Sequence, residues 1–189
     1  MPTQAQLIDA ADVIATLARN IALKRALTEV DDDPALNFWR MALGSSMDIA
    51  VMEWCKLFGN DDAAHQPTHW KNVIDPQDHA TFRTDMFAHT GLGKGAWDDY
   101  WDSMKSYRDS HVAHLDARRH RRVANYPELG TALSSATFYY QRVIAMLRGT
   151  GFDRYPNDLA MYYDAFHAQT QEIAKAAIAA TNGFDEAVG

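Results

Sequence analysis

The amino-acid sequence predicts an all-α fold, an antiparallel up-and-down bundle of about five to six helices. Two observations lead to this prediction. Long stretches carry apolar residues three or four positions apart, which is the spacing of one face of an α-helix. No stretch alternates apolar and polar residues in the way that predicts a β-strand. A chain of 189 residues that is 47% hydrophobic can bury a sizeable core, so we expect residues 1–189 to form a single domain.

Three helices are expected in the first half of the chain. The first covers residues 3–30, where three consecutive aspartates and a proline end it. The second covers residues 35–58 and ends at a glycine followed by an asparagine. Residues 60–75 are rich in Asp, Asn, Pro and His without any period, which predicts a loop. A proline then opens a third helix over residues 76–90.

Three more helices are expected in the second half. Glycines at alternate positions of residues 91–95 break the third helix, and a fourth helix covers residues 96–115. The fifth covers residues 127–147, where two glycines stop it. The alanine-rich last helix covers residues 158–181. The fourth helix matters most below, because its apolar face turns polar near its end.

Charge and cysteine content limit the possible functions. The net charge of −7 opposes nucleic-acid binding, so any RNA contact requires a local basic patch such as Arg118–Arg122. One cysteine, Cys55, excludes an internal disulfide and cysteine-rich zinc sites, which fits a reducing cytosol. The beginning of the chain lacks a basic and apolar leader, and no apolar run is long enough to span a bilayer. We therefore expect a cytoplasmic protein with no membrane contact.

Two weak motifs do not change this picture. Residues 91–95 include glycines and a lysine, as a phosphate-binding loop does, but they join two helices without the required strand and predict an interhelical turn. His65 and His69 have a spacing that suits a metal, yet they lie in a predicted loop with no clear third ligand. We expect no metal and no other cofactor.

The aromatic residues are best explained by core packing rather than by base stacking or a cofactor site, because they fall at helical core spacing. They are Trp39, Trp54, Trp97, Trp101, Tyr139, Tyr140, Tyr162 and Tyr163.

The end of the fourth predicted helix concentrates polar groups. Arg108, Asp109, His111 and His114 occupy two turns, and at about 100° per residue the steps from Arg108 to His111 and from His111 to His114 are each about 60° of arc. These side chains could therefore line one pocket. A guanidinium can hold a phosphate, and an imidazole can move a proton to or from a ribose hydroxyl, which suffices for metal-free RNA cleavage. The structural alternative is an Arg–Asp pair that caps the helix, with the histidines hydrogen-bonded in the core.

The segment Tyr107-Arg108-Asp109-Ser110-His111-Val112-Ala113-His114-Leu115-Asp116 resembles the Arg-polar-x(n)-His signature of the HEPN superfamily. Upstream, Asp48, residues 53–59 and His69-Trp70 resemble the segment that precedes the signature in abortive-infection-like members. The resemblance covers residues 35–130. It implies an all-α bundle, and many such proteins are ribonuclease toxins or antiviral effectors that act as dimers.

The resemblance also implies a role for each signature residue. Arg108 would bind the phosphate and stabilise the transition state, and His114 would be the general base on the ribose 2'-hydroxyl. Asp109 would be the polar residue that orients them. The products would carry 2',3'-cyclic phosphate and 5'-hydroxyl ends, without metal.

The spacing of the signature departs from the commonest family pattern. Five residues separate Arg108 from His114, where four is commonest and longer spacings are accepted. This leaves open whether His111 or His114 is the base. Arg108 and His114 lie about 120° apart on a straight helix, which is too wide for one small pocket unless a partner subunit completes it. The sequence therefore favours a composite site in a homodimer.

Two carboxylates and a basic run are further candidates. Asp48 and Glu53 lie on the second helix, where either could pair with Arg108. Asp48 is preferred because it falls beside the apolar stripe, whereas Glu53 can point to solvent beside Trp54. The arginines that follow the signature could hold RNA phosphates, or could belong to a solvated loop. They are Arg118, Arg119, Arg121 and Arg122.

The leading hypothesis is a metal-independent endoribonuclease of a bacterial toxin–antitoxin or antiviral defence type, acting on RNA and possessing a cognate antitoxin or nucleotidyltransferase partner. The main alternative is a non-catalytic HEPN-like module that binds a nucleotide or RNA, or that mediates protein interaction. A third is a metal-dependent hydrolase that uses His65, His69, His111 or His114.

Overall fold

The computed structural model describes residues 1–61, 66–113 and 126–185, and all regular structure in these ranges is helical. In chain order the elements are α1 (Gln4–Val30), α2 (Asn37–Phe58), α3 (Trp70–Val73), the 3-10 helix η1 (Pro76–Asp78), α4 (His79–Thr90), α5 (Lys94–Tyr107), the π-helix η2 (Arg108–Ala113), α6 (Leu129–Gly149) and α7 (Leu159–Thr181). The prediction of a helical bundle is confirmed.

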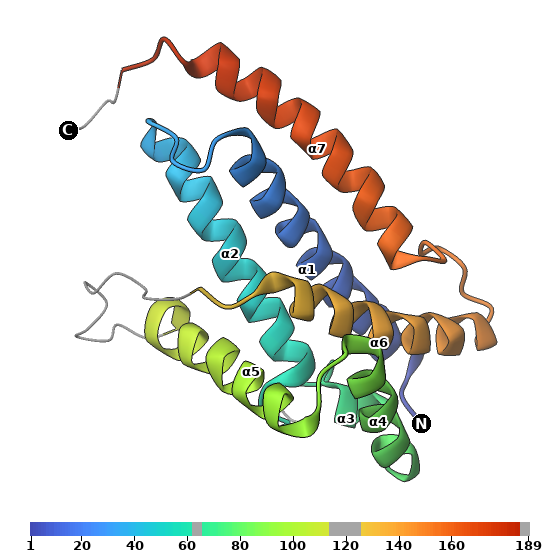
Figure 1. Cartoon of the computed structure of the whole chain (residues 1–189). Helices are drawn as coiled ribbons and strands as arrows, with labels where there is room; N and C mark the ends of the chain where they lie inside the picture. Colours follow the sequence, from blue (N-terminus) through green and yellow to red (C-terminus); the bar gives the residue numbers. More distant parts are fainter. Residues whose placement is uncertain (62–65, 114–125, 186–189) are drawn as a thin grey trace.

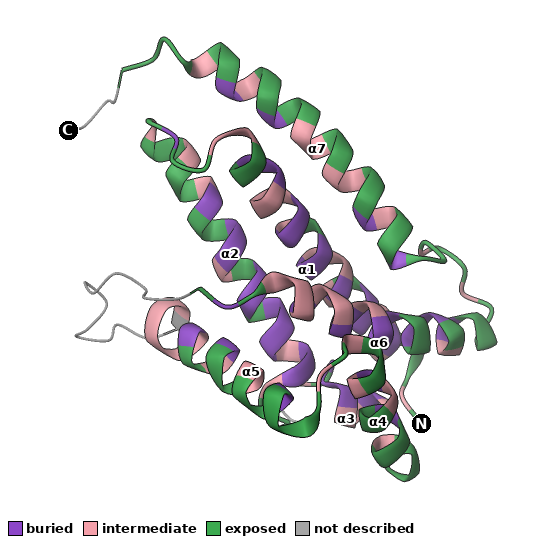
Figure 2. Cartoon of the chain, in the orientation of Figure 1, coloured by how far each residue is buried: buried purple, intermediate pink, exposed green. Residues whose placement is uncertain are grey.

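Helix α1 is the centre of the bundle. It packs against α2, α6 and α7, and Figure 1 shows α2 and α7 on either side of it while α6 runs across α1 and α2. Helix α5 lies along the second half of α2, and α4 packs on α6. The buried faces of these helices are turned toward one another, and the outer face of α7 is largely exposed (Figure 2). The functional region described below lies where α5 leaves α2.

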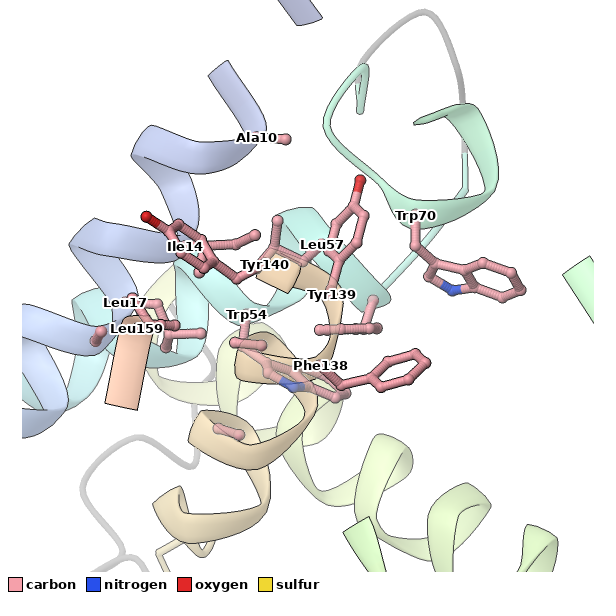
Figure 3. Close-up of a cluster of buried hydrophobic side chains, with 14 of the residues drawn as sticks. Ala10, Ile14, Leu17, Trp54, Leu57, Trp70, Phe138, Tyr139, Tyr140 and Leu159 are labelled. Atoms are coloured by element: carbon pink, nitrogen blue, oxygen red, sulfur yellow. The ribbon is translucent and has the colours of Figure 1, made fainter. Parts of the chain in front are cut away.

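The core combines small aliphatic and large aromatic residues. Ala10, Ile14 and Leu17 of α1 are fully buried, and the alanine allows neighbouring helices to approach closely (Figure 3). Trp54 of α2 and Tyr139 of α6 occupy the middle of the cluster (Figure 3). The Trp54 indole donates a hydrogen bond to Ser135 Oγ at 3.1 Å, so the buried N–H is satisfied. Burial of each large aliphatic side chain contributes about 1.5–3 kcal/mol relative to an exposed position.

Capping residues explain where several helices begin and end. Thr3 forms a capping box with Gln6, and the Asp158 carboxylate accepts hydrogen bonds from Ala160 N and Met161 N. Gly91 ends α4 in the left-handed conformation, with φ of 71°, which a residue with a side chain rarely adopts. These ends agree with the predicted ones to within one or two residues.

The structure corrects three local predictions. Helix α3 forms inside the predicted loop of residues 60–75, so the described residues contain seven α-helices. His69 caps α3: its Nδ1 accepts a hydrogen bond from Lys71 N at 3.2 Å. Helix α5 begins at Lys94, so Gly95 lies inside it instead of breaking the chain before it. The α-helical geometry of α5 ends at Tyr107, where the chain continues as η2. Among the described residues, no helix is both long and apolar enough to cross a membrane.

Candidate functional site

The candidate site is built on the contact between α5 and α2. Trp97 and Tyr100 of α5 place their rings 5.9 and 5.4 Å from that of Trp54, and Trp101 Nε1 donates a hydrogen bond to Phe58 O at 2.6 Å. Aromatic pairs of this kind add to the stabilisation that burial supplies. They hold α5 against the second half of α2, so that the end of α5 lies beside the middle of α2.

Tyr107 and Asp48 join the two helices at that point. The Tyr107 hydroxyl donates a hydrogen bond to Asp48 Oδ1 at 2.8 Å, and Tyr107 is only 7% exposed. Burial raises the pKa of Tyr107 well above its usual range, and the Asp48 carboxylate raises it further. From the sequence, Asp48 was the preferred of two candidate partners for Arg108. It reaches the signature segment through Tyr107 instead.

The signature segment itself is π-helical. Residues Arg108–Ala113 form η2, in which backbone hydrogen bonds run from residue i to i+5. Each turn therefore contains more residues than a turn of an α-helix. The arcs of about 60° that were predicted between the signature residues do not apply here. Such π-helical turns are rare and are often found at functional sites. The prediction of regular α-helix through residue 113 is wrong for this reason.

Arg108 is held by the residue that follows it. Its Nε and Nη2 donate hydrogen bonds to Asp109 Oδ1 at 2.8 and 2.6 Å, and Lys105 Nζ lies 2.9 Å from Asp109 Oδ2. Burial alone would raise the pKa of Asp109, but the hydrogen bonds from Lys105 and Arg108 outweigh it and hold the pKa below its usual range. The Asp109 carboxylate therefore stays ionised at neutral pH. Asp109 therefore contacts Arg108 directly, and its predicted role of orienting Arg108 and His114 stays a prediction.

The Arg108 side chain is enclosed without being fully buried. It is 19% exposed, whereas the Asp109 side chain is 34% exposed. A guanidinium has five N–H donors in a planar fork, and the two bonds to Asp109 use donors on one edge. The remaining donors of this planar group are suited to the negatively charged oxygens of a ligand such as phosphate.

Cys55 of α2 is a neighbour of Arg108. The sequence did not identify it as a site residue. Burial raises the pKa of the Cys55 thiol to about 11, although the neighbouring Arg108 guanidinium acts in the opposite direction. The thiol is therefore protonated and inert at neutral pH. A signal for this contact exists in the sequence, because Cys55 is seven residues after Asp48 and lies on the same face of α2.

The histidines of the signature are only partly described. The His111 ring centroid lies 5.1 Å from that of Tyr107, and His111 is half-buried. His114 lies outside the described residues, as do the four predicted RNA-binding arginines, Arg118, Arg119, Arg121 and Arg122. The structure therefore places Asp48 and His111 against Tyr107, and Asp109 against Arg108.

The sequence suggested that Glu53 can point to solvent, but the structure shows that it does not. It is 9% exposed, and its carboxylate accepts a hydrogen bond from Lys56 Nζ at 2.7 Å. An acidic residue with so little exposure requires a partner, and the lysine three residues later supplies it. Glu53 thus has a local partner on α2 that is distinct from Arg108.

His69 has a structural role. It is 1% exposed, and burial lowers its pKa to about 4, so the ring is neutral at physiological pH. Its predicted companion, His65, lies outside the described residues. Over residues 1–61, 66–113 and 126–185, no three His, Cys, Asp or Glu side chains come together as metal ligands would.

Comparison with known protein families identifies the family of the chain. The family model HEPN_AbiU2, described as AbiU2, matches residues 5–169. The matched range contains Asp48, Cys55 and the whole of η2, and it ends within α7. No curated protein and no solved structure matches the chain.

Proposed function

This chain belongs to the AbiU2 family of HEPN domains, and we propose that it is a metal-independent endoribonuclease of a bacterial toxin–antitoxin or antiviral defence system. It would cleave RNA to 2',3'-cyclic phosphate and 5'-hydroxyl ends. The observation that carries this proposal is the Arg108 guanidinium at the first residue of a π-helical turn, oriented by Asp109 and still partly exposed. Fold alone does not establish chemistry, whereas this side chain can act directly on an RNA phosphate.

Arg108 would stabilise the charge that develops on the phosphate during cleavage. A guanidinium group is permanently charged, and Asp109 restricts its orientation before RNA binds. A donor that is already oriented toward the transition state costs no reorganisation during the reaction. Removal of one such donor typically lowers kcat by about 100-fold to 1,000-fold.

The general base would be a histidine of the signature. His114 is the position that the family pattern favours, and His111 is the second candidate. His111 is half-buried against the Tyr107 ring, three residues after Arg108 in the π-helical segment. The base would take the proton from the ribose 2'-hydroxyl, whose oxygen then attacks the adjacent phosphorus and expels the 5'-oxygen.

A second copy of the chain would complete the site. Phe38, Met41, Ile49 and Met52 are exposed apolar residues of α2 that follow one another at helical spacing. This strip runs past Asp48, so a copy docked on it would approach η2. Exposed apolar strips on a globular protein often mark an interface, and a twofold axis would place the same strip on both partners.

The ion pair between Arg108 and Asp109 also favours a second function. An arginine whose charge is already balanced can bind an RNA or nucleotide phosphate without any chemistry, as a non-catalytic HEPN-like module would. The two functions differ in whether the RNA is cut. They therefore share one experiment.

The experiment is cleavage of a mixed RNA pool in EDTA by the purified full chain, with analysis of the product ends. Wild type, Arg108→Ala, His111→Ala and His114→Ala are compared. Arg142→Ala is the matched control, because Arg142 Nη2 pairs with Asp85 Oδ2 at 2.9 Å on α6 and α4, on a more exposed surface. Circular dichroism checks that each variant is folded.

We expect wild type and Arg142→Ala to leave cyclic phosphate ends, and Arg108→Ala to lose at least about 100-fold in rate. Of the two histidine variants, the one that loses activity to a similar degree identifies the base. RNA binding without cleavage by the wild type would favour the non-catalytic module. Cleavage that requires added metal would contradict the proposal.

A further inference from the structure

A pocket of about 600 Å³ lies at the opposite end of α5 from Arg108, between the end of α2, α3, α4 and the first turns of α5. Its volume falls in the range of sites that hold a small organic ligand. Cys55, Asp48, Tyr107 and Arg108 are not among its lining residues. The ribonuclease chemistry proposed above therefore leaves this pocket unexplained.

One wall of the pocket is aromatic, and part of it faces outward. Trp70 and Trp97 are 6% and 8% exposed and form the base of the wall. Trp101 is half-buried, and its indole N–H donates to Phe58 O at 2.6 Å, which fixes the orientation of the ring. Sequence analysis assigned Trp101 to the core. Its remaining exposure inside a pocket offers a preoriented π surface to a flat ligand.

The same pocket carries positive charge. Lys71 and Lys94 line it, and each is paired with an aspartate, Asp61 or Asp98. Arg83 lines it too, is exposed, and forms no ion pair with any residue that the structure describes. Its guanidinium carbon lies 5.9 Å from the centre of the Trp70 ring. An aromatic wall beside an arginine of this kind suits a ligand that has both a flat ring and an anionic group.

The first turn of α5 adds to this preference. Its N-cap is Gly93, which has no side chain to accept hydrogen bonds from the first backbone amides of the helix. These amides and the positive end of the helix dipole favour an anion near Lys94. The backbone amides of the first turn of α5 therefore add to the preference for an anionic ligand. The main evidence for that ligand is Trp101 and Arg83.

The pocket and Arg108 share one face of α5. Lys94, Trp101, Lys105 and Arg108 are separated by seven, four and three residues, which keeps them on one side of the helix. Arg108 is seven residues after Trp101, or about 10 Å further along the helix axis. This is about the length of three stacked nucleotides of a single strand.

We propose that this pocket binds one nucleotide, with the base on Trp101 and a phosphate near Arg83, and that this nucleotide belongs to a single-stranded RNA whose scissile phosphate lies at Arg108. That the nucleotide belongs to an RNA strand rests on the proposed ribonuclease function. That the pocket binds a nucleotide does not rest on this function. A free mononucleotide has the same chemistry, and the test separates the two sources.

The test measures binding to the full chain by fluorescence anisotropy with a fluorescein-labelled, 12-nucleotide 2'-O-methyl RNA, which cannot be cleaved because its 2'-oxygen is blocked. Unlabelled AMP is the competing mononucleotide. The variants are Trp101→Ala, Trp101→Phe and Arg83→Ala. Each has a matched control elsewhere in the fold.

Trp39→Ala is the control for tryptophan, because Trp39 is also half-buried and its indole N–H donates one hydrogen bond, to Thr181 Oγ1 at 3.0 Å. Arg154→Ala is the control for arginine, because Arg154 is exposed and its guanidinium carbon lies 5.8 Å from the Phe152 ring centre. Neither control residue lines the pocket.

We expect Trp101→Ala to raise the RNA Kd about tenfold, which is typical for loss of one base–aromatic stack. Arg83→Ala should also raise it, and Trp101→Phe should restore most of the affinity. The two controls should stay within about twofold of wild type. Weak competition by AMP would identify the strand as the ligand source, and tight competition would identify a free nucleotide.

The outcomes separate this inference from the ribonuclease proposal. Binding that depends on Trp101 and Arg83, without cleavage of ordinary RNA, would support the pocket and contradict the ribonuclease. Cleavage by wild type together with unchanged Kd values in Trp101→Ala and Arg83→Ala would overturn the pocket alone. Arg83 is exposed, so its variant remains informative even where Trp101→Ala fails to fold.

Discussion

The charged side chains at the two ends of helix α5 differ in their exposure to solvent. At the first end, the Lys94 and Asp98 side chains are 73% and 53% exposed, and the pair borders an open pocket. At the other end, Arg108 is 19% exposed and is held by Asp109 against α2. The first pair is hydrated and easily replaced, whereas the second restricts one guanidinium to a narrow range of orientations.

This difference shows that one helix can present two kinds of site. An open end can admit a ligand of variable shape, because its groups are hydrated before the ligand arrives. An enclosed end can fix a catalytic group, because its neighbours have already excluded water and limited its motion. The following predictions test this contrast between enclosed and exposed groups, in order of decreasing effect.

The largest expected effect concerns His69, which lines the pocket but is itself buried. Burial lowers its pKa to about 4 from the ordinary value of 6.5. Between these values the unfolded chain binds a proton that the folded chain does not, so stability is complete above pH 6.5 and falls as the pH drops toward 4. The loss approaches about 3 kcal/mol.

His69→Asn removes this titration while keeping a residue that can cap α3. We expect the unfolding free energy of the variant, measured in urea at several pH values, to change less than that of the wild type between pH 6.5 and 4. Carboxylates titrate in both proteins, so the difference between the two curves isolates His69. Identical pH dependence would show that His69 is accessible to protons in the folded chain.

The next effect concerns two tyrosine–aspartate hydrogen bonds. Tyr107 donates to Asp48 at 2.8 Å in the enclosed region, and Tyr155 donates to Asp12 at 2.7 Å at the surface. We expect Tyr107→Phe to destabilise the fold by about 1–2 kcal/mol, because the Asp48 carboxylate loses a buried donor. Tyr155→Phe should cost less than about 0.5 kcal/mol. Equal losses in thermal or urea unfolding would refute the difference between the two regions.

The smallest effect concerns two lysines of α5, each of which pairs with the aspartate four residues later in the chain. Lys105 and Asp109 are each 34% exposed, whereas Lys94 and Asp98 are far more exposed. We expect Lys105→Ala to cost about 0.5–1 kcal/mol and Lys94→Ala less than about 0.5 kcal/mol. Urea unfolding of both variants at low and high salt measures this. A larger loss for Lys94→Ala would reverse the assignment of the two ends.

Local sequence signals predicted most of the fold because they act over a few residues. The periodicity of α1, the capping box at Thr3 and the carboxylate cap at Asp158 depend only on neighbours in the chain. For the same reason the Arg108–Asp109 pair could be predicted, since the partners are adjacent. The short helix α3 was not predicted, because four residues are too few to show a period.

By itself, the sequence determined the helical fold, the family resemblance and the position of the signature at the end of a helix. Only the tertiary structure decided that this segment is π-helical. It also decided that Tyr107, rather than Arg108, donates a hydrogen bond to Asp48, and that Cys55 is a neighbour of Arg108. It also decided that Trp97 is buried while Trp101 remains partly exposed in a pocket. The physical reason is that periodicity predicts which face of a helix is buried. The elements that pack against that face decide how deeply each of its side chains is buried.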